Sequence, residues 1–312
     1  MKIFNNLNIP NVYKKSAIAI GNFDGVHLGH QKVFNETKKI AKKNKIKFGV
    51  LTFTPLPVLF FNKKIKNYRL TSEFQKLNFL KENKVDFVIN MKFNKKFSRI
   101  EAIDFIKKII YKKINPKLLA VSNNFRFGKN RIGDVNLLKK FSKNYDYKLL
   151  NIKPYKINNQ IISSTKIRKY LKAGKIYLAN KLLSRTWFIE GKVMKGKKLG
   201  RKLGYRTCNI NIRNYILPKL GIYSVKVLIG NKKKIHEGVS YLGTRPTFYG
   251  QEVFLETNIF NFKKNLYKKK LRVYFLKFIR RDRKFKGSKE LISQMNKDVI
   301  LAKKGLKTKL VL

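Results

Sequence analysis

The residues best suited to chemistry lie in one ten-residue stretch near the start of the chain. Residues 21–30 have the sequence Gly-Asn-Phe-Asp-Gly-Val-His-Leu-Gly-His, with three glycines, a carboxylate and two of the chain's three histidines. An apolar run at residues 17–20 precedes the stretch, and residues 31–43 follow with apolar side chains at helical spacing. A glycine-rich turn between a buried strand and a helix favours anion binding, because the first N–H groups of a helix lack intrahelical partners.

The two histidines of this turn, His27 and His30, are three residues apart. At the start of a helix, this spacing places their side chains roughly 5–6 Å apart on one face. That arrangement suits the phosphates of a nucleoside triphosphate. The alternative is a tight strand-to-helix turn in which the histidines are incidental.

A second set of phosphate-binding side chains is expected near residue 165. Ser164, Thr165 and Arg168 lie at the start of a helical pattern over residues 165–172. The planar guanidinium of Arg168 matches the geometry of phosphate oxygens. The alternatives are a helix cap for the Ser164-Thr165 pair and a solvent-exposed helix face for Arg168.

Strand and helix patterns alternate through the first half of the chain. We expect strands at residues 16–21, 47–53, 85–91, 118–121 and 147–152, and helices at residues 31–43, 73–84, 101–111 and 135–143. Ser72 and Gln75 have the spacing of a capping box for the second helix. This alternation predicts an α/β fold with a parallel sheet covered on both faces, and ligands at the carboxyl ends of its strands.

The second half of the chain has a different pattern. Two short helices are expected at residues 165–172 and 176–183, followed by runs of period two at residues 188–193, 221–228, 237–242, 253–260 and 271–278. These runs, separated by glycine-containing turns, predict a small antiparallel barrel or sandwich with a terminal helix at about residues 288–303 packed on it. We therefore expect two domains, residues 1–184 and 185–312.

The composition limits the class of protein. With 312 residues and 43% hydrophobic side chains, the chain is long enough for roughly two packed domains. No apolar run approaches the roughly 20 residues that cross a bilayer, and we expect no signal peptide. The single cysteine, Cys208, excludes an intramolecular disulfide and indicates a cytoplasmic protein, and the few cysteines and histidines leave little material for structural zinc.

The formal net charge of +58 would ordinarily suggest a nucleic-acid partner. The lysines, however, are spread through every expected element and occur with abundant asparagine and isoleucine, as in proteins encoded by A- and T-rich sequence. We therefore expect compositional drift rather than a dedicated nucleic-acid surface. The charge should still attract phosphate-bearing ligands in a salt-dependent way.

The first half of the chain resembles the adenylyltransferase module of the bacterial bifunctional riboflavin kinase/FAD synthetase family. His27-Leu28-Gly29-His30 matches the H-x-G-H signature of nucleotidyltransferases. The similarity continues at residues 124–128 (Asn-Phe-Arg-Phe-Gly), 133–135 (Gly-Asp-Val) and 162–168 (Ile-Ser-Ser-Thr-Lys-Ile-Arg).

This resemblance implies a Rossmann-like domain in which His27, His30 and Arg168 are catalytic and contact ATP phosphates. It also implies that ATP or FMN is bound by Gly21, Phe23, Asp24, Gly29, Asn124, Phe125, Ser164 and Thr165. Asn124 and Phe125 suit the flavin, although core packing is an equal alternative for Phe125. Two departures bear on the flavin site: Leu56 stands where the family usually has histidine, and Ser122 stands where it usually has glycine.

The second half resembles the flavokinase module of the same family. Residues 200–209 (Gly-Arg-Lys-Leu-Gly-Tyr-Arg-Thr-Cys-Asn) match a glycine-rich turn that ends in a P-T-A-N motif, and residues 243–248 and 254–257 also match. By resemblance, Gly200 and Gly204 belong to the nucleotide site, Thr207 and Asn209 serve Mg²⁺ and the ATP phosphates, and Glu256 is the general base.

Two residues depart from this second motif. Arg206 replaces the proline, which could cost the loop its rigidity, and Cys208 replaces the alanine, where we expect a small buried side chain. For Glu256 the alternative is an outward-facing strand residue.

The combined resemblance implies a bifunctional transferase that phosphorylates riboflavin with MgATP to FMN and then adenylylates FMN with ATP to FAD and pyrophosphate. One alternative is an FAD synthetase whose kinase barrel is impaired by Arg206 and Cys208. A second is a polyanion- or nucleic-acid-binding protein on the same scaffold. The expected partners are riboflavin, FMN and ATP, without a membrane, and the sequence leaves the oligomeric state open.

Overall fold

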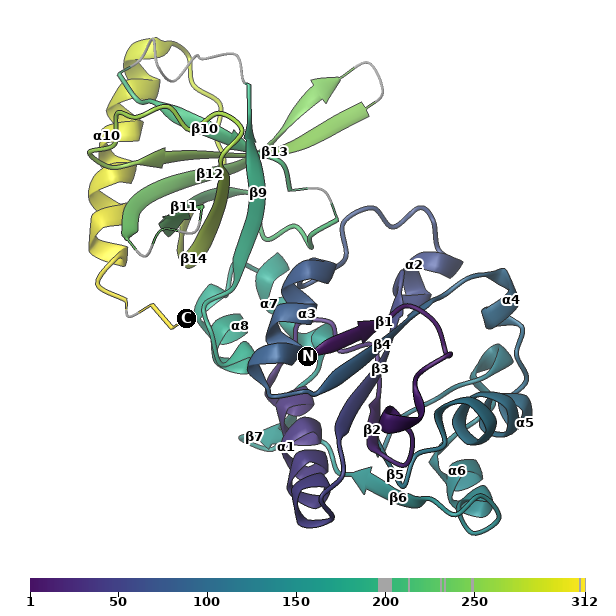
Figure 1. Ribbon diagram of the computed structural model, residues 1–312. Helices are drawn as coiled ribbons and strands as arrows, with labels where there is room; N and C mark the ends of the chain where they lie inside the picture. The colour runs from purple at the N-terminus through teal and green to yellow at the C-terminus, as the bar shows by residue number, and fades with distance from the viewer. Residues whose placement is uncertain are drawn as a thin grey trace. The chain divides into compact units, whose positions relative to one another are not determined.

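The computed structural model describes residues 1–195, 204–212, 214–230, 232, 234–247, 250–308 and 310–311. Its contacts divide the chain into two compact units (Figure 1). The first unit comprises Met1–Lys66 and Thr71–Ser163, and the second comprises Asn67–Leu70 and Ser164–Leu312. The short segment Asn67–Leu70 therefore packs with residues that lie far along the chain.

A parallel six-stranded sheet forms the centre of the first unit. Its strands, in spatial order, are β1 (Lys2–Phe4), β4 (Phe87–Lys92), β3 (Phe48–Thr54), β2 (Ala17–Ile20), β5 (Leu118–Ser122) and β6 (Lys148–Ile152). The chain proceeds from β2 through β3 to β4 on one side, and β5 lies on the other side of β2. The order of strands thus reverses at β2, and ligands bind at such a point at the carboxyl ends of the strands.

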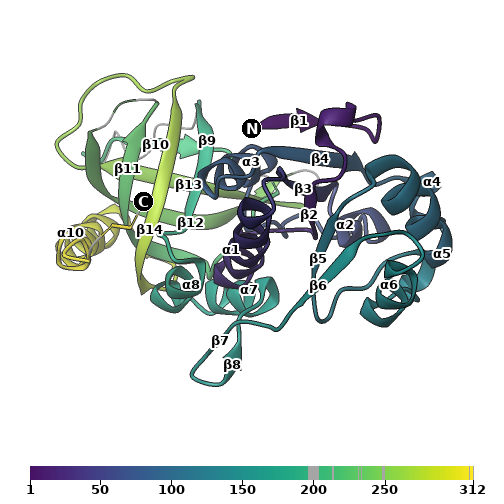
Figure 2. The same cartoon turned by 60° about the horizontal axis from the view of Figure 1, so that its bottom comes forward.

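Helices cover both faces of this sheet, as expected for a parallel sheet (Figure 1). Helix α1 (Leu28–Lys43) contacts β2, β3 and β5, whereas the π-helix η2 (Phe105–Ile114) packs in the core cluster on the opposite face, where Ile18 and Ile20 point. The other helical segments are η1 (Asn11–Tyr13), α2 (Pro57–Phe61), α3 (Glu73–Glu82), α4 (Lys95–Ser98), α5 (Ala102–Asp104), η3 (Lys129–Arg131) and α6 (Val135–Ser142). A small hairpin, β7 (Lys156–Ile157) and β8 (Gln160–Ile161), projects from this unit (Figure 2).

A closed antiparallel barrel forms the centre of the second unit. Its strands, in order around the barrel, are β10 (Thr207–Ile210), β13 (Gly250–Ile259), β12 (Ile235–Thr247), β11 (Gly221–Ile229), β14 (Lys270–Arg280) and β9 (Phe188–Met194). The described residues of this unit also form the helices α7 (Ser164–Lys172), α8 (Ile176–Leu183) and α10 (Ser288–Gly305). Both the predicted parallel sheet and the predicted barrel with a terminal helix are confirmed.

The segment Asn67–Leu70 adds a strand-like stretch to the second unit. The main chain of Arg69 donates to the carbonyl of Asn214 at 3.0 Å and accepts from Ile216 at 2.7 Å. The indole N–H of Trp187 donates to the carbonyl of Leu70 at 2.8 Å, and both of these side chains are fully buried. These contacts lie inside the second unit, although residues 67–70 come from the first third of the sequence.

Candidate active sites

The turn after β2 has an unusual backbone. Phe23, Gly25 and Val26 have φ values of 49°, 87° and 39°, all in the left-handed region. For non-glycine residues, and above all for a β-branched one, such a conformation is uncommon and costs about 1–3 kcal/mol each. Surrounding contacts must therefore hold the turn in this shape.

Asp24 provides part of that support. Its side chain is buried, and its carboxylate accepts hydrogen bonds from the main-chain N–H of Thr71 at 3.3 Å and from the Thr71 hydroxyl at 3.4 Å. The Thr71 hydroxyl oxygen also accepts from the N–H of Gly25 at 3.3 Å. In this structure, then, the predicted ligand residue Asp24 fixes the turn to the start of α3.

The two histidines lie together at the beginning of α1. His27 is the N-cap residue, its main-chain carbonyl accepts from the N–H of His30 at 2.8 Å, and its ring Nδ1 accepts from the same N–H at 3.4 Å. The imidazole rings are stacked, with centroids 3.6 Å apart and planes inclined by 19°. The two side chains lie side by side, as predicted, but the rings are closer than the roughly 5–6 Å expected for two residues within a helical turn, and His27 is the N-cap rather than a residue of the helix.

Two glycines allow this close packing. A Cβ atom at Gly29 would lie 3.1 Å from the ring of His27, and one at Gly21 would lie 3.0 Å from the ring of Phe23. The Phe23 ring in turn contacts His30 edge-on at 5.2 Å between centroids. The structure thus brings Gly21, Phe23, Asp24, His27, Gly29 and His30 together in one turn.

A buried polar group that the sequence analysis missed lies at the carboxyl end of β3. The ammonium of Lys76, on α3, donates to the Thr52 hydroxyl at 3.1 Å and to the Phe53 carbonyl at 3.4 Å. The Thr52 hydroxyl donates to the carbonyl of Asn22 at 3.3 Å. The chain has 74 basic residues, so residue type alone does not mark Lys76 as buried. The sequence feature that could have indicated its burial is its helical spacing from the buried Phe79 and Leu80.

Aromatic side chains gather near the same strand ends and were also missed. They form edge-to-face and tilted pairs with centroids 5.3–6.1 Å apart, and they are Phe53, Phe60, Phe61, Phe93 and Phe97. Phe61 is 68% exposed, which is unusual for so large an apolar side chain. The nearby Leu56, which departs from the family motif, is buried at 4% exposure.

The predicted flavin residues Asn124 and Phe125 follow β5. Asn124 is exposed, and its side-chain carbonyl accepts from the Ser122 hydroxyl at 2.9 Å. Phe125 is half-buried and stacks on Phe127, with centroids 5.5 Å apart, while packing against the core cluster. Phe125 therefore combines core packing with a partly open face.

Helix α7 of the second unit begins at Ser164, with Thr165 exposed. Arg168 is buried at 9% exposure, so it does not lie on a solvent-exposed helix face. Its Nε donates to the carbonyl of Tyr68 at 2.9 Å, and its guanidinium carbon lies 3.8 Å from the centre of the Tyr68 ring. The side chain is thus held in a fixed position by the segment Asn67–Leu70.

Strand register brings the predicted kinase residues to one face of the barrel. Asn209 of β10 lies directly opposite Glu256 of β13, and Thr207 lies opposite Asn258. Residues directly opposite in an antiparallel pair have Cβ atoms about 4.5–5.5 Å apart. Thr207, Asn209 and Glu256 are half-buried, whereas Cys208 between them points into the barrel.

The two predicted glycines of this site have different outcomes. Gly204 has a φ of 83°, in the left-handed region that favours glycine. Gly200 lies outside the residues that the structure describes.

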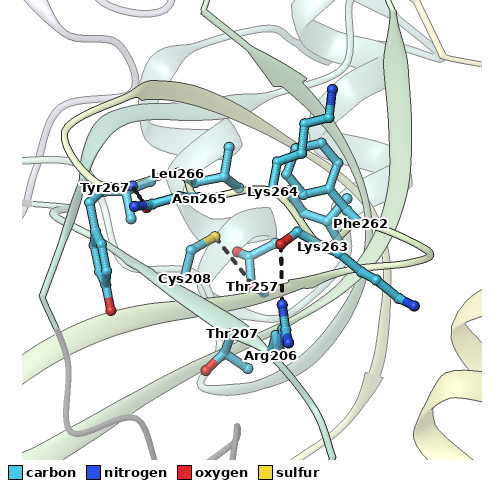
Figure 3. A pocket seen from close by; sticks show the side chains of 12 residues that line it. Arg206, Thr207, Cys208, Thr257, Phe262, Lys263, Lys264, Asn265, Leu266 and Tyr267 are labelled. Atoms are coloured by element: carbon cyan, nitrogen blue, oxygen red, sulfur yellow. Dashed lines mark hydrogen bonds between the residues drawn. The ribbon is translucent and has the colours of Figure 1, made fainter.

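A pocket of about 260 Å³ opens beside these strands (Figure 3). Its lining combines apolar side chains with lysines and arginine: Val193, Arg206, Thr207, Cys208, Thr257, Ile259, Phe262, Lys263, Lys264, Asn265, Leu266 and Tyr267. The Arg206 side chain donates to the carbonyl of Lys263 at 3.2 Å, and the Arg206 carbonyl accepts from the Asn258 amide at 2.8 Å. Residue 206 is therefore fixed by hydrogen bonds where a proline would be fixed by its ring.

Cys208 behaves as a buried packing residue. Burial, the largest cause, raises the pKa of its thiol to about 12, and the charge of Glu256 adds to the effect. The thiol donates to the carbonyl of Thr257 at 3.3 Å (Figure 3). A thiol that stays protonated at neutral pH is a poor nucleophile, as expected for this position.

The described part of the chain contains no group of three or more His, Cys, Asp or Glu side chains placed to hold a metal ion. None of its helices combines the length and the apolar character needed to cross a bilayer.

Models of two protein families match the chain one after the other. The FAD synthetase family matches residues 9–166, and the riboflavin kinase family matches residues 183–306. The first match covers the histidine turn, and the second covers the whole barrel. The FAD synthetase model therefore matches the half of the chain that contains His27 and His30, and the riboflavin kinase model matches the half that contains Thr207, Asn209 and Glu256.

Curated relatives align with nearly the whole chain. A bifunctional riboflavin kinase/FMN adenylyltransferase from Buchnera aphidicola subsp. Schizaphis graminum is 40% identical, covering 97% of this chain and 98% of the relative. The protein of the same name from Escherichia coli strain K12 is 34% identical, covering 92% and 91%.

A solved structure titled macrolide-efflux protein, from Streptococcus pneumoniae, is similar over 96% of this chain and 98% of that one. Its TM-score is 0.84 at 27% sequence identity. That title differs from the names of the curated relatives, whereas both family models agree with them. The chain belongs to the bifunctional riboflavin kinase/FMN adenylyltransferase family.

Proposed function

We propose that this chain makes FAD from riboflavin in two steps, each with its own ATP. The barrel phosphorylates riboflavin to FMN and releases ADP, and the α/β unit adenylylates FMN to FAD and releases pyrophosphate. The observation that carries the proposal is that one chain contains two separate groups of residues suited to phosphate chemistry. The stacked His27–His30 pair lies on a strand-to-helix turn, and the Thr207, Asn209 and Glu256 side chains share one face of a barrel.

In the adenylylation, an oxygen of the FMN phosphate attacks the α-phosphorus of ATP, and the bond to the β-phosphate oxygen breaks. Negative charge grows on the oxygens around the α-phosphorus, so catalysis consists mainly of positioning and charge stabilisation. We assign this stabilisation to His27, His30 and the N–H groups at the start of α1. On the basis of the family resemblance, we assign Ser164, Thr165 and Arg168 to the ATP phosphates as well.

The flavin ring of FMN needs an apolar surface and a polar group that orients it. Asn124 and Phe125 supply this combination after β5. The partly exposed aromatic group that includes Phe60 and Phe61 supplies a second apolar surface at the carboxyl ends of β3 and β4.

In the kinase reaction, Glu256 takes the proton from the terminal hydroxyl of the ribityl chain as that oxygen attacks the γ-phosphorus. The pocket beside β10 suits the nucleotide, because apolar residues such as Ile259 and Leu266 can cover a purine. Arg206, Lys263 and Lys264 supply positive charge there.

Mg²⁺ is the metal that we propose for the kinase site. The Thr207 hydroxyl and the Asn209 amide are hard oxygen donors two residues apart on one strand face, beside the Glu256 carboxylate, and this donor set fits Mg²⁺. When bound there, the ion would neutralise charge on the transferred phosphate.

The family membership favours the bifunctional enzyme over an FAD synthetase with an impaired barrel, because the riboflavin kinase match extends over residues 183–306. We keep the prediction that the positive charge reflects composition rather than a nucleic-acid partner. We likewise propose a cytoplasmic location, with riboflavin, FMN and ATP as substrates.

Product analysis tests both steps. The protein is incubated with riboflavin, ATP and Mg²⁺, and FMN and FAD are separated by chromatography. His27→Ala should lower FAD formation about 10²–10³-fold while FMN accumulates. Glu256→Gln should lower FMN formation about 10²–10⁴-fold, while FAD still forms when FMN is supplied.

The two variants serve as controls for each other, since each leaves the other reaction intact. If the folded wild-type protein made neither product, the proposed function would be wrong. If His27→Ala abolished both products in a folded protein, the assignment of separate sites would be wrong.

A further inference from the structure

A buried lysine lies next to the adenylylation turn, and neither the motifs nor the reaction scheme accounts for it. Lys76 is 3% exposed, although its side chain carries an ammonium group. Burying an ammonium is expensive unless hydrogen bonds compensate for the lost water. The position of this lysine therefore needs a physical reason.

The hydrogen bonds of Lys76 lead to the turn. Its Nζ donates to the Thr52 hydroxyl oxygen at 3.1 Å, and the Thr52 hydroxyl donates to the Asn22 carbonyl at 3.3 Å. A hydroxyl has one hydrogen, and an ammonium can only donate. The lysine therefore fixes the direction of the Thr52 hydroxyl and turns its hydrogen toward Asn22.

The carbonyl of Asn22 belongs to the same peptide plane as the N–H of Phe23. In a trans peptide these two groups point in opposite directions. The bond from Thr52 therefore directs the Phe23 N–H away from β3, at the first residue of the turn with a positive φ. Lys76 and Thr52 thus set the orientation of a peptide group within the proposed phosphate site.

We propose that Lys76 is a positioning residue for adenylyl transfer. Acting through Thr52, it holds the Asn22–Phe23 peptide so that the Phe23 N–H faces the phosphates of ATP, and its charge favours an anion at this edge of the sheet. The inference rests on the proposed function of the turn and adds Lys76, which lies outside the matched motifs.

Four variants test this chain of hydrogen bonds. Lys76→Met removes the ammonium at similar length, Thr52→Val removes the hydroxyl at equal size, and Thr52→Ser keeps the hydroxyl. Lys81→Met is the matched control, since Lys81 is an exposed lysine on the same helix. The kcat and KM of FAD formation from FMN and ATP are measured beside FMN formation from riboflavin and thermal unfolding.

We expect Lys76→Met and Thr52→Val each to lower kcat/KM for FAD formation about 10-fold or more, with FMN formation unchanged. The double variant should be no worse than the more impaired single variant, because both changes interrupt one chain of bonds. Thr52→Ser should recover most of the loss, and Lys81→Met should match the wild type.

Several outcomes would overturn the inference. One is a kcat/KM for FAD formation in Thr52→Val that equals that of the wild type. Another is a double variant in which the losses of the two single variants add. A third is a fall in FMN formation as large as the fall in FAD formation, together with a lower unfolding temperature. If Lys76→Met does not fold, Thr52→Val and its serine counterpart decide the question. A wild-type protein that forms no FAD would instead contradict the proposed function itself.

Discussion

At the scale of single residues, position 206 shows how one side chain can replace the constraint of another. The family usually has proline here, and proline fixes φ through its ring. In this chain the guanidinium of Arg206 donates a hydrogen bond to the Lys263 carbonyl instead. The main-chain carbonyl of residue 206 also accepts from the Asn258 amide, which a proline carbonyl could do equally. The contact between Arg206 and Lys263 lies at the pocket that we assign to the nucleotide of the kinase (Figure 3).

We expect Arg206→Ala to raise the KM for ATP in FMN formation about 2- to 10-fold, because one hydrogen bond contributes about 0.5–1.5 kcal/mol. Steady-state kinetics with riboflavin and varied ATP would measure this change. Lys263→Ala is the control, since it removes a neighbouring positive charge but keeps the carbonyl that accepts from Arg206. An equal rise in KM for both variants would show that charge, rather than the hydrogen bond, is what matters.

The residues of the histidine turn could be predicted because they are consecutive in the sequence. Their supporting partners could not, because Thr71 is 47 residues from Asp24 and Lys76 lies 24 residues from Thr52. Nothing in the type of a lysine distinguishes one buried position from many exposed ones in so basic a chain. The residues of the turn can thus be recognised in the sequence, whereas the contacts that support the turn depend on the folded structure.

At the scale of elements, the buried strands and amphipathic helices were predicted well because hydrophobic periodicity marks them. Four of the described strands were missed. β1 is an edge strand of three residues with two exposed side chains, and β7 and β8 have two residues each. β10 has four residues, three of them inside the kinase motif, so none of the four gives a clear pattern. The helix predicted at residues 101–111 is instead α5 followed by a π-helix that ends at Ile114.

A partly buried ion pair joins helix α10 to the barrel. Asp298 accepts two hydrogen bonds from the Arg280 guanidinium, at 2.8 and 2.6 Å, and its side chain is 5% exposed. The Arg280 side chain is partly exposed, so removal of Asp298 costs the hydrogen bonds between the two charged groups, about 1.5–3 kcal/mol. We therefore expect Asp298→Ala to destabilise the second unit by that amount.

The fluorescence of Trp187, the single tryptophan of the chain, would follow this loss during denaturant unfolding, since the side chain is buried in the same unit. Glu290→Ala is the control. Its ion pair with Arg283 is about half exposed and should contribute less than about 1 kcal/mol. Equal stability of Asp298→Ala and the wild type would contradict a supporting role for the pair.

At the scale of the whole molecule, the chain passes between its two units three times. It enters the second unit at residue 67, returns at residue 71 and enters again at residue 164. As a result, residues from the first third of the sequence hold Arg168 and cover Trp187 inside the second unit. The FAD synthetase match, residues 9–166, therefore includes a segment that packs in the second unit, Asn67–Leu70.

A protease site engineered between Ser184 and Arg185 tests this arrangement. We expect the two fragments to elute together in gel filtration after complete cleavage and to separate in denaturant. After cleavage, residues 214–216 of the barrel fragment would still form hydrogen bonds with Asn67–Leu70 of the other fragment. The Phe275 carbonyl of the barrel would also still accept a hydrogen bond from Asn180 of α8. Separate elution under native conditions would contradict the expectation.

The inserted segment Asn67–Leu70 also has a consequence for how such a gene can be divided. A break at the border of the two activities would encode a first polypeptide with an exposed Leu70 and a second whose Trp187 N–H has lost its acceptor. Neither polypeptide would be expected to form a stable fold by itself. Fission of the gene would therefore yield an obligate pair of subunits, and co-expression, rather than mixing after purification, would be the way to obtain it.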